Sequence, residues 1–494
     1  MSHGINIPLS ALRTKKSCGI GEFFDLLPLI DWCQEVGFNI IQLLPLNDSG
    51  TDPSPYNALS SCALNPIYLS LSDLPDAPNP GELGALQHTP YHDILTLKYN
   101  FLRDYYAKEG KTLLNTTECQ TFIESNPWLI PYALFKTLKD RLSQTHWMFW
   151  PDDLKKPNYD LLLEKHHDDM LFYVFVQYLC FEQMTHVKRV ATSKTILLKG
   201  DIPILVSPDS VDCWLHPELF DFTYFAGAPP DSYNLEGQNW GFPLFNWERV
   251  KSENFGWWKE RLFVASHYYN LYRIDHVVGL FRIWAILPGG QAREGKFIPE
   301  NPALWIPQGK EVLQMMSAAS PMQPIAEDLG TIPPSVRTCL AELGIPGTKV
   351  VRWERDYTTQ GKFLPYADYP SLSMTTVSTH DSETLQQWWQ STPQEAQLLA
   401  QTYGWTYSPD LTFDQRLQLL HDAHHTPSRY HINLLQEYLA LFPAFVWPHP
   451  NDERINIPGT VTPTNWTYRF RPSVEEFTGH AELKKVLKKI LSST

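Results

Sequence analysis

Acidic residues recur in this sequence just after short apolar or β-branched runs. Each acid taken alone has an ordinary explanation, because aspartate is common as a helix N-cap and in the loops between strands and helices. Their repetition at the same end of successive predicted strands is harder to explain in this way, because neighbouring carboxylates repel one another unless catalysis uses them. We expect the four acids to converge on one rim: Asp209 in VSPDS, Asp275 in LYRID, Glu327 in PIAEDL and Asp381 in STHDSET.

Two of these acids suit the cleavage of a glycosidic bond, which requires one ionised carboxylate and one carboxyl group that holds a proton. Arg273 lies two residues before Asp275, so both side chains share one strand face and the guanidinium favours the ionised form of Asp275. Glu327 lies in an apolar run, where desolvation and nearby negative charge would raise its pKa. The pattern predicts Asp275 as nucleophile and Glu327 as acid and base; a buried Arg273–Asp275 ion pair that only stabilises the fold is the alternative.

Eight short runs along the chain have the apolar or β-branched character of strands. Helical patterns separate some of them: one begins near Asp25 and stops at Gly37, and another spans 331–344, with paired prolines at its start. Eight strands with intervening helices predict an α/β fold, a (β/α)8 TIM barrel whose active site lies at the carboxyl ends of the strands. The predicted strands are 5–9, 39–45, 201–206, 271–275, 324–329, 348–353, 374–379 and, with the weakest pattern, 442–447.

The second and third predicted strands are about 155 residues apart, far more than one connecting helix requires. We therefore expect a mainly helical subdomain at 70–200, inserted into a single catalytic domain that spans 1–494. The stretch 205–250, after the third strand, is rich in proline, glycine and aromatic residues. It is expected to form irregular loops over the active site.

The composition narrows the classes of ligand and the cellular location. A net charge of −14 without a long basic run argues against nucleic acid as a partner. The seven cysteines are scattered and contain no C-x-x-C pair, which argues against a disulfide framework or zinc site and fits a cytoplasmic protein. The N-terminus has no apolar core of signal-peptide length, and no apolar stretch of the sequence has the length of a membrane span. Aromatic residues make up 13%, many of them beside polar residues, and this combination suits sugars.

Specific motifs extend this interpretation over nearly the whole chain. In their order and spacing, RIDH, AEDLG and THD form the most distinctive set. With them, the sequence resembles the 4-α-glucanotransferases called amylomaltases or disproportionating enzymes, which are members of the wider α-amylase superfamily. The other motifs are GIGEF (19–23), QLLPLND (42–48), SPYNALSSCALNP (54–66), GDIPILVSPDSVDCW (200–214), GAPPD (227–231), GQNWGFP (237–243), GIPGTKV (344–350) and ERINIPGT (453–460).

The resemblance implies roles for individual residues. Asp275 would be the nucleophile, Glu327 the acid and base, and Asp381 a third acid that binds sugar hydroxyls and distorts the ring. No metal and no organic cofactor would take part. The residues implied in substrate binding are Arg273 and His380 beside the reacting sugar, Asp209, Trp240, Tyr56, Ser54 and Asn456 along the glucan cleft, and Tyr233 on the acceptor side.

The implied activity is retaining transfer of α-1,4-glucan segments through a covalent glycosyl-aspartate intermediate. Maltooligosaccharides and glucans would be donors, and other glucans or glucose would be acceptors. Phe242 and the segment PPDSYN depart from the commonest family pattern, and QLLPLND resembles the subgroup typified by the plant cytosolic disproportionating enzyme. An α-glucan hydrolase and a glycan-binding protein without activity are the alternative classes, and the sequence makes no prediction of oligomeric state.

Overall fold

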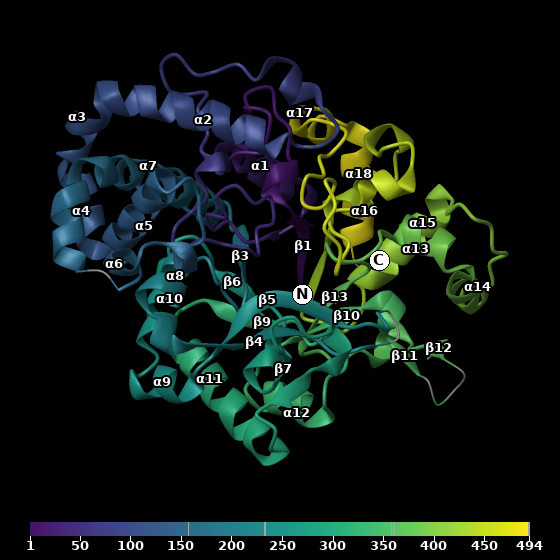
Figure 1. Cartoon of the computed structure of the whole chain (residues 1–494). Coiled ribbons are helices and arrows are strands. Elements are labelled where there is room, and N and C mark those ends of the chain that lie inside the picture. Colours follow the sequence, from purple (N-terminus) through teal and green to yellow (C-terminus); the bar gives the residue numbers. More distant parts are fainter. Residues whose placement is uncertain (157, 232–233, 357, 359–360, 493–494) are drawn as a thin grey trace.

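Eight parallel strands form a barrel in the computed structural model, which describes all residues except 157, 232–233, 357, 359–360 and 493–494 (Figure 1). The strands follow one another around the barrel in chain order, and β1 pairs with β14. The two remaining edges meet where the Ala326 amide donates to the Pro346 carbonyl at 2.8 Å. The predicted (β/α)8 barrel is therefore confirmed. Its strands are β1 (Ser2–Ile7), β2 (Ile40–Leu43), β3 (Leu197–Ile202), β6 (Leu271–Ile274), β9 (Gln323–Ala326), β10 (Gly347–Val350), β13 (Ser373–Thr376) and β14 (Tyr430–Leu434).

The two helices expected from their start and stop signals are present. Helix α1 spans Leu26–Val36 and ends at Gly37, whose φ of 103° is readily available to glycine. Helix α12 spans Pro334–Glu342, in the predicted segment 331–344. The other helices after β3 are α8 (Val211–Leu215), α9 (Trp247–Ser252), α10 (Gly256–Ser266), α11 (Trp305–Ala319), α13 (Leu385–Ser391), α14 (Pro393–Thr402), α15 (Phe413–His424), α16 (Leu435–Leu439), α17 (Val474–Thr478) and α18 (Ala481–Leu491).

The eighth barrel strand is β14, and the prediction of a strand at 442–447 was wrong. In YHINL, the polar residues His431 and Asn433 interrupt the apolar pattern, although both are buried in the fold. FPAFVW instead contains a 3₁₀ helix at Pro443–Phe445. Proline at the first position fixes φ and has no amide to donate to a ladder, which favours this short helix over a central strand.

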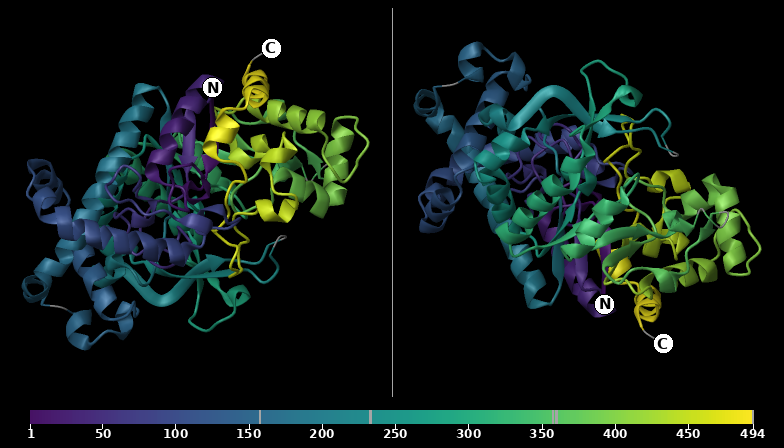
Figure 2. Two further views of the ribbon diagram at one scale, coloured as in Figure 1. Left: turned by 90° about the horizontal axis from the view of Figure 1, so that it is seen from above. Right: turned by 90° about the horizontal axis from the view of Figure 1, so that it is seen from below.

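Helices fill the long connection between β2 and β3. They gather at one side of the barrel, whereas α13, α14 and α15 lie at the opposite side (Figures 1 and 2). The longest, α7, packs against α5 and leads back to β3. No helix in the described part of the chain combines the length and the apolar character needed to cross a bilayer. The helices are α2 (Tyr91–Tyr105), α3 (Lys111–Leu114), α4 (Thr117–Ser125), α5 (Leu129–Arg141), α6 (Asp152–Lys155) and α7 (Tyr159–Ser193).

A second, antiparallel sheet lies outside the barrel and corrects the prediction that 205–250 is wholly irregular. Two of its strands come from this segment and pair with register shifts, which explains why no regular alternation is visible in the sequence. Phenylalanine and tyrosine favour the pleated, half-buried surface that such a sheet offers. The sheet has the order β5-β4-β7-β8, with β4 (Phe220–Ala228), β5 (Gln238–Phe245), β7 (Ile283–Ile286) and β8 (Lys296–Ile298), and a separate hairpin joins β11 (Arg355–Asp356) to β12 (Lys362–Phe363).

Candidate active site

One buried guanidinium connects three carboxylates at the carboxyl end of the barrel. Arg273 Nη1 lies 2.8 Å from Asp201 Oδ2 and 2.7 Å from Asp275 Oδ1, and its Nη2 lies 2.8 Å from Glu327 Oε2. The Arg273 side chain is 9% exposed, whereas Asp275 and Glu327 are 24% and 20% exposed. The arginine is thus nearly enclosed, while the two acids remain accessible to a substrate.

Strand register brings these four side chains together. Asp201 on β3 and Arg273 on β6 are paired positions of adjacent parallel strands, so their side chains lie side by side. Asp275 follows β6 directly, and Glu327 follows β9, where its amide donates to the Ile274 carbonyl at 3.0 Å. The predicted convergence of Asp275 and Glu327 at one rim is confirmed by this arrangement.

Asp201 was missed in the sequence, although it satisfies the criterion that identified Asp275. It lies near the end of a barrel strand, and the motif GDIPILV contains it. Asp209 was selected instead, because the predicted third strand was placed at 201–206. Since the strand is Leu197–Ile202, Asp201 is the residue that faces Arg273.

Asp209 does not join the other three predicted acids through any described hydrogen bond or ion pair. Its Oδ2 lies 2.6 Å from Lys139 Nζ on α5, and its Oδ1 accepts from the Trp147 amide at 3.1 Å. The partners of Asp209 are thus Lys139 and Trp147 of the inserted segment, rather than the residues around Arg273. A role for Asp209 in glucan binding stays a prediction.

Asp381 lies on a separate branch of the polar network. Its Oδ1 accepts from Asn456 Nδ2 at 2.7 Å, and its Oδ2 lies 3.2 Å from His380 Nε2. Although burial acts in the opposite direction, His380 and Asn456 hold the pKa of Asp381 well below its usual range. Burial also opposes protonation of His380, but Asp381 more than offsets it and raises the pKa of His380. Asp381 is therefore an ionised acceptor near neutral pH.

Tyr56 connects this branch with the arginine cluster. Its hydroxyl donates to Asp201 Oδ2 at 2.8 Å and lies 2.9 Å from His380 Nε2. The Tyr56 ring stacks on His380, with centroids 5.6 Å apart, and contacts the ring of Trp466 at 5.4 Å. Trp466 was not selected as a site residue from the sequence, because a lone tryptophan in a loop gives no local signal of its partners.

The remaining predicted binding residues have more peripheral positions. Trp240 on β5 contacts the His276 ring edge-on at 4.8 Å, and its Nε1 donates to Gln238 Oε1 at 3.0 Å. Ser54 lies in the same loop as Tyr56. Tyr233 falls outside the described residues, so its predicted acceptor-side role stays a prediction.

Glu327 is the carboxyl group of the cluster that can hold a proton. Burial, together with the negative charges of Asp275 and Asp381, raises the pKa of Glu327 from 4.5 to about 7, against the opposing effect of Arg273. The His276 amide also donates to Glu327 Oε2, at 2.6 Å. His276 reaches this position with a φ of 44°, a left-handed conformation that is unusual for a side chain larger than glycine. Glu327, which can donate a proton, and the accessible side chain of Asp275 therefore both contact the Arg273 guanidinium.

This arrangement suits acid and nucleophile chemistry at a sugar carbon. Within the described residues, no group of three or more histidine, cysteine, aspartate or glutamate side chains has an arrangement that could hold a metal ion. The groups that face the cluster are aromatic rings and amide or hydroxyl donors, which complement the apolar faces and hydroxyl edges of a glucan.

Comparisons with known proteins identify the family. The family model described as 4-alpha-glucanotransferase, of glycoside hydrolase family 77, matches residues 7–475. The 4-alpha-glucanotransferase of Chlamydia pneumoniae is 45% identical over 99% of this chain and 95% of its own. The solved amylomaltase from Streptococcus agalactiae in complex with acarbose has a TM-score of 0.84 and 25% identity over 99% of this chain and 98% of its own. The chain therefore belongs to the 4-alpha-glucanotransferase family, glycoside hydrolase family 77, and is an enzyme of this class.

Proposed function

We propose that this enzyme transfers α-1,4-glucan segments by double displacement, with Asp275 as nucleophile and Glu327 as acid and then base. The observation that carries the proposal is the single Arg273 guanidinium that contacts both carboxyl groups. Retaining enzymes hold their two carboxyl groups about 5–5.5 Å apart, close enough for one to attack while the other protonates the leaving oxygen. That both acids contact the same guanidinium supports such a proximity.

The two acids differ in the way that such a reaction needs. Arg273 Nη1 lies 2.7 Å from Asp275 Oδ1, and this contact orients the carboxylate that attacks the anomeric carbon. Glu327 has a pKa raised to about 7, so a proton is available for the glycosidic oxygen when the bond breaks. After the first product leaves, ionised Glu327 accepts the proton of the 4-hydroxyl of the acceptor, which attacks the glycosyl-aspartate.

Other residues bind the sugar around this pair. Ionised Asp381, oriented by Asn456 and His380, accepts hydrogen bonds from sugar hydroxyls and favours a distorted ring. Tyr56 offers its ring and hydroxyl on the same side. Further contacts along the glucan are assigned to Trp240, Trp466, Ser54, Asp209 and Tyr233.

The products formed from a single maltooligosaccharide test the proposal directly. With maltotriose as sole substrate, transfer gives glucose together with longer oligomers, because one maltotriose accepts the segment removed from another. An α-glucan hydrolase would give glucose and maltose without longer products. A binding protein without activity would give no product while still retaining the sugar. Product ladders from maltose, maltotriose and glycogen, run side by side, also show which chain lengths serve as donors and acceptors.

A further inference from the structure

Asp48 lies at the base of the loop that carries Tyr56 and helps to close it, beside the bridge between Asn47 and Leu64. The Asp48 amide donates to the Ala63 carbonyl at 2.9 Å, and the Leu59 amide donates to the Asp48 carbonyl at 2.6 Å. Its carboxylate also accepts from the Gly50 amide at 2.9 Å. Asp48 thus joins the outgoing and returning parts of the loop, whose position determines where Tyr56 lies.

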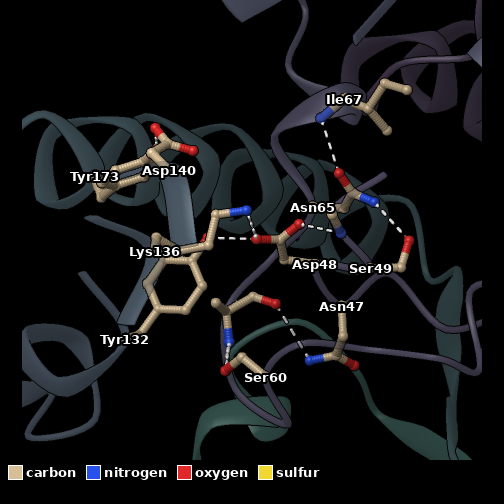
Figure 3. A network of polar contacts seen from close by, with 12 residues as sticks. Asn47, Asp48, Ser49, Ser60, Asn65, Ile67, Tyr132, Lys136, Asp140 and Tyr173 are labelled. Atoms are coloured by element: carbon tan, nitrogen blue, oxygen red, sulfur yellow. Dashed lines mark hydrogen bonds and ion pairs between the residues drawn. The ribbon is translucent and has the colours of Figure 1, made fainter. Parts of the chain in front are cut away.

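Helix α5 of the inserted segment holds this base. Lys136 Nζ lies 2.9 Å from Asp48 Oδ2, and the Tyr132 hydroxyl donates to the same oxygen at 2.7 Å (Figure 3). The two charged residues are 4% and 1% exposed, so water scarcely competes for the pair. Burial favours the neutral amine, but the Asp48 carboxylate more than offsets it and raises the pKa of Lys136. The ammonium group therefore stays charged.

The other contacts of the loop differ in kind. Asp52 accepts from the Ser54 amide and from Asn57 Nδ2, so it shapes the loop without anchoring it to another element. Tyr91, on α2, contacts the Gly50 carbonyl at 3.2 Å and Ser49 Oγ at 3.3 Å. Among the described anchors of the loop base, the Lys136 contact is the one between two opposite charges.

At its far end the loop makes a contact that tolerates little displacement. The Tyr56 hydroxyl lies between Asp201 Oδ2 at 2.8 Å and His380 Nε2 at 2.9 Å. Asp201 is paired with Arg273, which in turn contacts Glu327. A shift of the loop by about 1 Å would break these hydrogen bonds, and displacements of this size can cost ~10²-fold in rate.

We propose that Lys136 is a positioning residue: by holding Asp48, it fixes the loop that places the Tyr56 hydroxyl between Asp201 and His380. The inserted helices then do more than enlarge the fold, because the Lys136 side chain acts on the active site through Asp48 and Tyr56. The inference rests on the proposed function, in which Asp275 and Glu327, both in contact with Arg273, carry out the chemistry.

A double-mutant cycle of Lys136→Met with Tyr56→Phe tests the proposal. The measured quantities are kcat and KM for maltotriose disproportionation, with circular dichroism as a check on folding. Lys136→Met is expected to lower kcat/KM by ~10–100-fold. In the Tyr56→Phe background the same change should have a much smaller effect, because the hydroxyl that Lys136 positions is already absent.

A matched control lies on a neighbouring helix. Lys98, on α2, is as deeply buried as Lys136 and pairs with Glu22 at 2.5 Å, but its other contacts are the carbonyls of Ile67 and Leu69, beyond the loop. Lys98→Met should reduce thermal stability and leave kcat/KM of the folded enzyme near the wild-type value. Comparison of Lys98→Met with Lys136→Met therefore separates the effect of losing a buried charge from the effect of displacing the loop that carries Tyr56.

Two outcomes would overturn the proposal. One is an equal effect of Lys136→Met with and without the Tyr56 hydroxyl, and the other is an effect on kcat/KM no larger than that of Lys98→Met. If Lys136→Met does not fold, Lys136→Gln replaces it in the cycle, because it removes the charge that faces Asp48 and keeps a polar end on the side chain. Asp275→Asn, assayed in parallel, reports on the catalytic assignment alone: activity in that variant would refute the proposed function.

Discussion

Replacing Glu327 by glutamine should lower activity and stabilise the fold at the same time. The substitution keeps the size of the side chain and removes both its charge and its acidic proton. In the wild type, Glu327 Oε2 lies 2.8 Å from Arg273 Nη2 and 2.6 Å from the His276 amide nitrogen. Because both donors contact the same oxygen, the glutamine oxygen can accept from both of them. Loss of general acid–base catalysis costs ~10²–10⁴-fold in rate, so we expect a fall of at least ~10²-fold.

The expected gain in stability follows from the pKa of Glu327, which rises from 4.5 to about 7 on folding because of burial and of the charges on Asp275 and Asp381. Between these values the unfolded chain releases the proton while the folded protein retains it, so ionisation favours unfolding. The free energy of unfolding thus falls as pH rises from 4.5 to 7 and levels off above. At 1.36 kcal/mol per pKa unit, the penalty reaches about 3 kcal/mol, and Glu327→Gln removes it.

Two assays check both halves of this prediction. Denaturant unfolding at pH 4.5 and pH 8 should show little difference between variant and wild type at the lower pH and a more stable variant at the higher. A maltosyl fluoride donor, whose leaving group needs no protonation, should restore glycosylation in the variant, and azide should release the product without a base. A variant that is less stable at pH 8, or one with wild-type turnover of maltotriose, would refute the reasoning.

Three further predictions concern the same enzyme. Asp275→Asn should reduce turnover by at least ~10³-fold while glucan binding by calorimetry persists, because it removes the nucleophile and keeps its shape; normal turnover would contradict the assignment. Since Glu327 must be protonated to act as acid, kcat/KM should fall as pH rises through about 7, and a flat profile to pH 9 would contradict this. Burial lowers the pKa of His431 to about 4, so the stabilising effect of its neutral ring is lost as pH falls from 6.5 to 4. The difference in the free energy of unfolding between wild type and His431→Gln should therefore become smaller as pH falls from 6.5 to 4. A constant difference would show that titration of His431 does not affect stability.

Local sequence patterns were sufficient to predict the barrel and most of its reactive side chains. Strand periodicity places Arg273 and Asp275 on one face, and the apolar run around Glu327 indicates a raised pKa. Helix start and stop signals predicted α1 and α12 close to their observed ends. These features depend on residues near one another in sequence, which is why a single sequence reveals them.

Contacts between distant segments were decided only by the tertiary structure. The register of β3 against β6 makes Asp201, rather than Asp209, the acid beside Arg273. The polar strand β14 became recognisable only once its side chains were seen buried against other elements. The pairing of Lys136 with Asp48 likewise joins a helix to a distant loop. The physical reason is common to all three: side-chain type and local periodicity determine which face a residue occupies, whereas its partner depends on packing and register between strands and helices far apart in the chain.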